Sequence, residues 1–192
     1  MFRHGFKSWC ERIALERRTE LGLKPDDRLD PRLLAEHLGI TVLQPSAIPG
    51  LSQKSLTQLL ETDRDGWSAI TLRQDTRSLI VLNTAHSAAR QVSDLMHELA
   101  HILLAHTPSR VDVTVDMYLL LRTHDHAQED EANWFAGCLL LPRPAVLDIH
   151  RRKEPAPDAA KRYGVSVEMM NYRLQVTGVA IQERRLKARL GR

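Results

Sequence analysis

Two amphipathic segments near the N-terminus predict helices. Residues 6 to 21 carry apolar side chains at broadly helical spacing among many charges, and Gly22 is expected to end that helix. Residues 30 to 39 have both ends marked, because Asp30 suits an N-cap, Pro31 suits the first helical position and Gly39 suits a stop. The N-terminal part is therefore predicted to be largely helical.

The next patterns predict a small twisted sheet. Residues 40 to 43 form an apolar strand that a proline closes, and residues 67 to 72 and 77 to 82 predict a β-hairpin joined by the sequence RQDT. Residues 45 to 65 are expected to form a loop with one short helix. The strand at 67 to 70 has two interpretations: a plain outer strand, or a strand that borders a cleft and to which a peptide adds.

Two longer segments predict helices that pack on this sheet and on each other. Ser87 can cap a helix from 88 to 106, and a second helix is expected over 129 to 141. Their predicted apolar faces consist of Val92, Leu95, Leu99, Ile102 and Leu103 in the first, and of Ala132, Phe135, Ala136 and Leu139 in the second. The predicted class is α+β, a small sheet with mostly helical surroundings.

The C-terminal part is predicted to be a helical subdomain. A proline-containing link at 152 to 158 leads to one last helical segment at 162 to 179 and then to a basic tail. We therefore expect a core with N-terminal helices over residues 1 to 145 and a C-terminal subdomain over 146 to 192.

Composition restricts the class of protein. The chain has 192 residues, 43% of them hydrophobic, a net charge of +3 and two widely separated cysteines, Cys10 and Cys138. A packed globular core is therefore expected, the cysteines suit a reducing compartment, and the mild charge names no partner. No apolar run approaches the roughly 20 residues that span a bilayer, and no signal peptide is evident. These features predict a cytoplasmic protein that does not contact a membrane.

Candidate chemistry lies in the predicted helix 88 to 106, where the sequence HELAH occupies residues 97 to 101. Residues four apart share a helix face, so His97 and His101 can direct two imidazole nitrogens at one zinc ion. Glu98 projects about 100° away and can reach a water molecule at the metal as a general base. The alternative is an amphipathic helix with two solvated histidines, which the apolar character of the segment disfavours.

A zinc site needs a third protein ligand. The metzincin pattern is excluded, since it requires glycine and histidine where this chain has Leu104 and Thr107. The remaining common solution is a carboxylate from a later helix, and Glu129, Asp130 and Glu131 begin such a helix. Acidic residues are also common near helix N-termini because of the helix dipole. Helical periodicity alone does not choose between Glu129 and Glu131.

Three motifs in order carry a family resemblance: HELAH, then EDEANWFAGCLLLP, then YGVSVEMMNYRLQVTG. Over residues 30 to 178 the chain resembles the ImmA/IrrE family of zinc metallopeptidases, which implies a zincin-like fold. Carried over by position, the resemblance places the zinc ligands on His97, His101 and Glu131 and the catalytic glutamate on Glu98. This sequence departs from the family pattern at Leu141 and Ala100, and neither substitution is expected to affect the helix or the catalytic residues.

The resemblance further implies a cytoplasmic zinc endopeptidase whose substrate is a helix-turn-helix repressor of a mobile element or a stress response. The alternatives are a DNA-binding regulator, suggested by the basic C-terminal tail, and a partner-binding module of the toxin-antitoxin kind without turnover. For the tail we favour a solvated helix end over contact with DNA.

Several other side chains are candidates for roles at the site. The donor for the oxyanion stays unassigned among Tyr118, His124, His126, His150, Tyr163 and Tyr172. A second group of histidines, His86, His106, His124 and His126, is interpreted as surface or loop residues rather than as a second metal site. Cys138 is expected in the core.

Overall fold

A computed structural model describes residues 2–74, 77–106, 112–113, 119–120, 125–179 and 181. The N-terminal half contains α1 (Phe6–Glu20), α2 (Pro31–His37), β1 (Thr41–Leu43), the 3₁₀-helix η1 (Pro45–Ala47), α3 (Gln53–Thr57), the π-helix η2 (Gln58–Thr62), β2 (Ala69–Gln74) and β3 (Arg77–Leu82). The rest contains α4 (Ala88–Leu103), β4 (Asp112–Val113), β5 (Leu119–Leu120), α5 (His126–Leu140), α6 (Arg143–Arg152), α7 (Ala156–Tyr163) and α8 (Val167–Val176). The fold is α+β, as predicted.

Three of the strands form one mixed sheet in the order β1-β3-β2. The central strand β3 pairs in parallel with β1, where Val42 lies opposite Ile80, and antiparallel with β2, where Thr71 lies opposite the same residue. Ile80 is buried, because β3 is covered by its neighbours and by α4. The predicted hairpin is thus confirmed, and β2 is an outer strand of this sheet.

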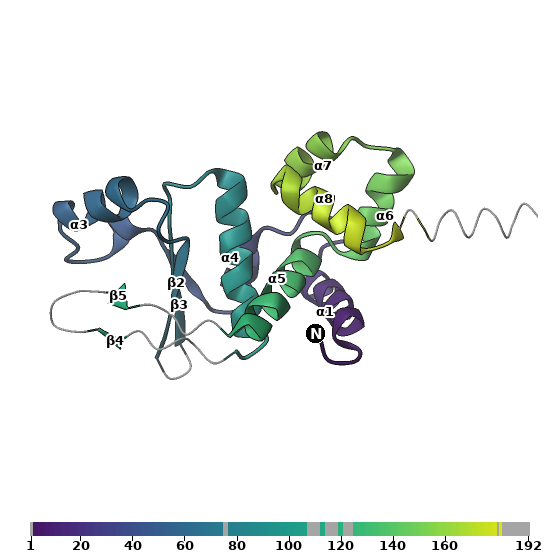
Figure 1. The fold of residues 1–192 in the computed structure, drawn as a ribbon. Helices are drawn as coiled ribbons and strands as arrows, with labels where there is room; N and C mark the ends of the chain where they lie inside the picture. Colours follow the sequence, from purple (N-terminus) through teal and green to yellow (C-terminus); the bar gives the residue numbers. More distant parts are fainter. Residues whose placement is uncertain are drawn as a thin grey trace, which may run out of the picture.

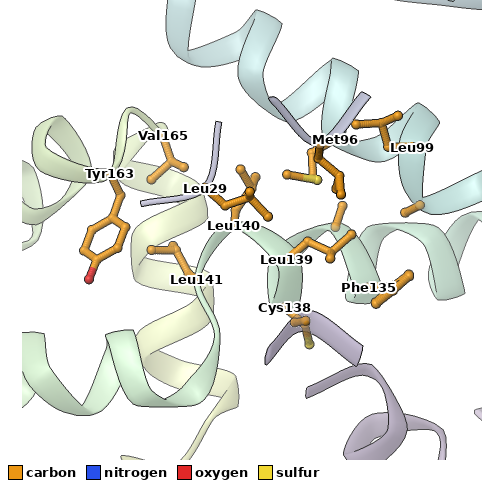
Figure 2. Close-up of a cluster of buried hydrophobic side chains, with 14 of the residues drawn as sticks. Leu29, Met96, Leu99, Phe135, Cys138, Leu139, Leu140, Leu141, Tyr163 and Val165 are labelled. Atoms are coloured by element: carbon orange, nitrogen blue, oxygen red, sulfur yellow. The ribbon is translucent and has the colours of Figure 1, made fainter. Parts of the chain in front are cut away.

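Helix α4 lies between the sheet and α5, as Figure 1 shows. Met96 and Leu99 of α4 and Leu139 and Leu140 of α5 all belong to the buried cluster that Figure 2 shows. The predicted inward residues of both helices lie in or against this core: Leu95, Leu99, Ala132, Phe135, Ala136 and Leu139 are buried, and Val92, Ile102 and Leu103 pack on it. This packing fixes the two helices that carry the candidate chemistry.

The C-terminal part differs from the prediction in its helix boundaries. The stretch predicted as a link contains the end of α6 and the start of α7, because Pro155 stands at the N-cap of α7 and does not interrupt it. The last helical segment is two helices, since Gly164 adopts a left-handed φ of 70° that ends α7 and Ser166 caps α8. The division of the chain at residue 145 stays a prediction, and α6 runs across that position.

A buried ion pair ties α8 to the rest of the molecule. The Arg173 guanidinium is fully buried and donates to the Leu141 carbonyl at 2.9 Å and to a Glu11 carboxylate oxygen at 2.6 Å. The other Glu11 oxygen accepts from the Arg143 backbone N–H at 2.8 Å, at the start of α6. One carboxylate from α1 therefore holds two C-terminal helices.

We expect Arg173→Met to lower the free energy of unfolding by about 3 kcal/mol, because the Glu11 carboxylate would lose its buried counter-charge. Urea denaturation followed by circular dichroism measures this change. The matched control is Arg12→Met, which removes an exposed arginine paired with Glu16 on the same helix and should cost less than about 0.5 kcal/mol. Equal effects of the two substitutions would contradict a structural role for Arg173.

Both cysteines are free thiols in the core, as predicted for Cys138. Burial raises the pKa of the Cys10 thiol to about 12 and also raises the pKa of Cys138. These thiols are therefore protonated at neutral pH, which suits packing rather than metal binding or nucleophilic chemistry. Within the described ranges, every helix is too short or too polar to cross a bilayer.

Candidate metal centre

The two histidines of HELAH lie side by side on α4. Their Nε2 atoms are 2.9 Å apart, and their side chains are 23% and 19% exposed for His97 and His101 respectively. Four-residue spacing on a helix places them on one face, one turn apart. The two nitrogens therefore converge on a point that solvent can reach.

A carboxylate from α5 completes this cluster. One Glu129 oxygen lies 3.2 Å from His97 Nε2 and the other lies 3.5 Å from His101 Nε2. Among the described residues, the group of His97, His101 and Glu129 is the set whose ligand atoms all lie within 4.8 Å of one another. Asp125 positions Glu129, since it caps α5 by accepting from the Ala127 N–H at 2.9 Å and so begins the helix before the acidic run.

The donor set fits a zinc ion. In a tetrahedral site with bonds of about 2.1 Å, two ligand atoms are separated by about 3.4 Å. The two Nε2 atoms are 2.9 Å apart, and each lies 3.2 or 3.5 Å from a different oxygen of Glu129, so these separations lie on either side of that value. Two imidazoles and one carboxylate are also ligand types that zinc accepts while leaving a fourth position for water. The residues present would thus hold the metal without a large rearrangement.

The structure places Glu131 elsewhere. Its carboxylate lies 3.4 Å from His106 Nε2, and His106 in turn lies 2.9 Å from His101, both through Nδ1. Residues two positions apart in a helix point about 200° away from each other. Accordingly, Glu129 contacts His97 and His101, whereas Glu131 contacts His106. The assignment of Glu131 as a metal ligand, made from the family resemblance, stays a prediction, and the geometry favours Glu129.

Glu98 lies beside the histidine pair and is largely buried, with 9% exposure. The Thr71 hydroxyl of β2 donates to its Oε2 at 2.5 Å. This contact places the outer strand of the sheet against the predicted general base. The carboxylate of Glu98, on α4, is thus anchored to β2.

Sequence reasoning missed the role of two histidines. His86 and His106 lie in loops, as interpreted from the sequence, but both are buried, at 6% and 8% exposure, and do not lie at the surface. His86 fixes the loop before α4, since its ring nitrogens contact the Arg64 carbonyl at 2.9 Å and Asp94 at 3.1 Å. The one available signal for His106 is its position five residues after His101, directly beyond the helix that carries the histidine pair.

The oxyanion donor stays unassigned. Tyr163 is buried and donates its hydroxyl to the Asp26 carbonyl at 2.7 Å, so this group is already engaged away from the histidine pair. Tyr118 and His124, two further candidates, lie outside the described residues. His126 is exposed at the first position of α5.

The site combines three features: a pair of histidines on one helix, a carboxylate from a second helix and a buried glutamate next to the pair. Within an α+β fold, this combination is typical of a metallopeptidase. The chain belongs to the M78 peptidase family, whose model, described as the IrrE N-terminal-like domain, matches residues 35–175. The family resemblance inferred from the three motifs is thereby confirmed.

Comparison with solved structures finds a similar fold in a Mycobacterium tuberculosis transcriptional regulator. The TM-score is 0.52 at 18% sequence identity, and the match covers 88% of this chain but 46% of that one. The chain therefore spans less than half of the regulator's length. No curated protein matches the sequence.

Proposed function

We propose that this protein is a zinc-dependent endopeptidase. The observation that carries the proposal is the convergence of His97, His101 and Glu129 next to the buried carboxylate of Glu98. Membership of a metallopeptidase family supports the same reaction class. When bound, a zinc ion supplies Lewis-acid chemistry and lowers the pKa of water at the site from about 16 toward about 7.

The residues of this chain then have separate roles in peptide-bond hydrolysis. His97, His101 and Glu129 hold the metal. Glu98 accepts the proton of the attacking water and passes it to the amine that leaves when the peptide bond breaks. The Thr71 hydroxyl donates to Glu98 and orients the carboxylate that accepts this proton.

The outer strand β2 is the proposed place for the substrate backbone. An extended peptide can pair with an outer strand of a sheet as an additional strand. Because Thr71 of β2 contacts Glu98, a peptide along β2 would pass close to the general base. Leu72, half exposed on the same strand, offers an apolar surface to a substrate side chain.

For the substrate we propose a helix-turn-helix transcriptional repressor, in the cytoplasm. The family resemblance supports this choice, and the similarity in fold to a transcriptional regulator is compatible with a regulatory setting. The alternative is a regulatory module that binds DNA or a partner without turnover. Zinc content and peptide-bond cleavage distinguish the enzyme from that alternative.

We expect the purified protein to cut a helix-turn-helix repressor at one bond, and the product of the adjacent gene is the first substrate to test. Intact mass spectrometry should show two fragments whose masses sum to that of the repressor plus one water. A chelator should abolish cleavage, because the donor set would lose its ion, and added zinc should restore it. Binding of the intact repressor without any fragments would favour the module without turnover.

A further inference from the structure

A buried histidine connects the proposed metal site to a second carboxylate. His106 lies just beyond the end of α4, where Ala105 adopts a left-handed φ of 53° and turns the chain back toward the helix. Its backbone N–H donates to the His101 carbonyl at 3.0 Å, and its own carbonyl accepts from Arg73 of β2 at 3.1 Å. The main chain of His106 is therefore anchored both to α4 and to β2.

The ring contacts form a continuous chain of atoms. His101 Nδ1 lies 2.9 Å from His106 Nδ1, and His106 Nε2 lies 3.4 Å from a Glu131 carboxylate oxygen. Two neutral imidazole nitrogens make a hydrogen bond only if one carries the proton. Which nitrogen carries that proton depends on whether His101 Nε2 is protonated or offers its lone pair to a metal.

We propose that His106 and Glu131 form a positioning relay that fixes the tautomer and the orientation of His101 for metal binding. This inference rests on the proposed metal site. If His101 Nε2 offers its lone pair to the metal, His101 Nδ1 carries the proton and donates it to His106 Nδ1. His106 then carries its proton on Nε2 and donates to Glu131, whose carboxylate only accepts. Metal binding at His101 Nε2 therefore determines which ring nitrogen of His101 and which ring nitrogen of His106 carry a proton.

The relay explains the presence of two carboxylates near the site. Metal-binding histidines usually donate their second N–H to an acceptor, and loss of that acceptor typically weakens metal binding by about 10- to 100-fold. Here the acceptor is another histidine, which Glu131 orients in turn. Glu129 and Glu131 thus have different tasks, since one contacts the histidine pair directly and the other acts through His106.

A double-mutant cycle on zinc affinity, measured by competition with a chromogenic chelator, tests the relay. His106→Leu should raise the zinc Kd by at least about tenfold. Glu131→Gln should raise it less in the wild-type background and should add almost nothing in the His106→Leu background, because Glu131 acts only through His106. His106→Asn should recover part of the lost affinity, since its amide oxygen can occupy the acceptor position of Nδ1.

Two further readouts separate positioning from folding. The melting temperature of each metal-free variant should stay close to that of the wild type. The control His37→Leu removes an exposed histidine of α2 that contacts Glu20 of α1, and it should change neither the zinc affinity nor the melting temperature. The visible spectrum of the cobalt-substituted protein should change in His106→Leu, because the orientation of one ligand changes. If His106→Leu does not fold, the same cycle with His106→Asn gives the comparison.

The outcomes distinguish this inference from the proposed function. If Glu131→Gln weakens zinc binding equally with and without His106, Glu131 contacts the metal directly and the relay is overturned. Unchanged zinc affinity in His106→Leu would overturn it as well. If neither the wild-type protein nor Glu129→Gln binds zinc, the proposed metal site is wrong, and the relay that rests on it is contradicted as well.

Discussion

Glu98→Gln should reduce peptide-bond cleavage by at least about a hundredfold while zinc stays bound. The amide has nearly the same shape as the carboxylate but cannot accept the proton of the attacking water. The metal ligands are untouched, so the zinc content should remain at one ion per chain. Fragment formation over time, measured by intact mass, and elemental analysis of the same sample give both quantities.

A suitable control is Glu61→Gln, the same substitution at an exposed glutamate of η2. It should cleave at the wild-type rate. If Glu98→Gln also cleaves at the wild-type rate, another group is the base and the proposed mechanism is wrong. If Glu98→Gln loses zinc, the side chain has a structural task that the contact with Thr71 does not explain.

His101→Ala should weaken zinc binding by at least about a hundredfold, equivalent to about 2.7 kcal/mol. The substitution removes one ligand nitrogen and also leaves His106 without its partner at 2.9 Å. His97→Ala should have a similar effect through the other nitrogen. Zinc per chain after dialysis against a weak chelator measures the loss.

The matched control for these two variants is His37→Ala, because His37 is a partly exposed histidine near Glu20 on the α1–α2 side of the molecule. It should retain one zinc ion. Full zinc occupancy in both His97→Ala and His101→Ala would show that the metal is bound elsewhere.

The sheet and the two central helices are predictable because their patterns are local. Short runs rich in apolar residues in β2 and β3 flank a short polar segment of sequence, and the apolar faces of α4 and α5 repeat at helical spacing. The proximity of His97 and His101 is predictable for the same reason, because residues four apart lie on one face of a helix. These features depend on spacing along one element, which a sequence shows directly.

The third ligand cannot be chosen in the same way. Whether Glu129 or Glu131 faces the histidines depends on how α5 crosses α4, which many side chains of the core determine together. Near the first turn of α5, both residues border the inward face, so periodicity allows either. The motif comparison selects Glu131, whereas the packing of the helices brings Glu129 to the pair.

The position of His106 cannot be predicted from the sequence, for a different reason. The turn that brings it back toward His101 is made by Ala105 with a positive φ, a conformation that favours glycine or asparagine. The residue type at that position therefore does not indicate a turn. In the C-terminal part, the prolines predict a link around Pro155, although proline is well accommodated at the start of a helix.

We propose that His97, His101 and Glu129 bind one zinc ion, and anomalous X-ray diffraction at the zinc absorption edge tests this binding most directly. We predict a single strong peak about 2.1 Å from His97 Nε2, His101 Nε2 and a Glu129 oxygen, with Glu131 against His106. A peak bound by Glu131 instead of Glu129, or a zinc-saturated crystal with no peak between the two histidines, would contradict the account.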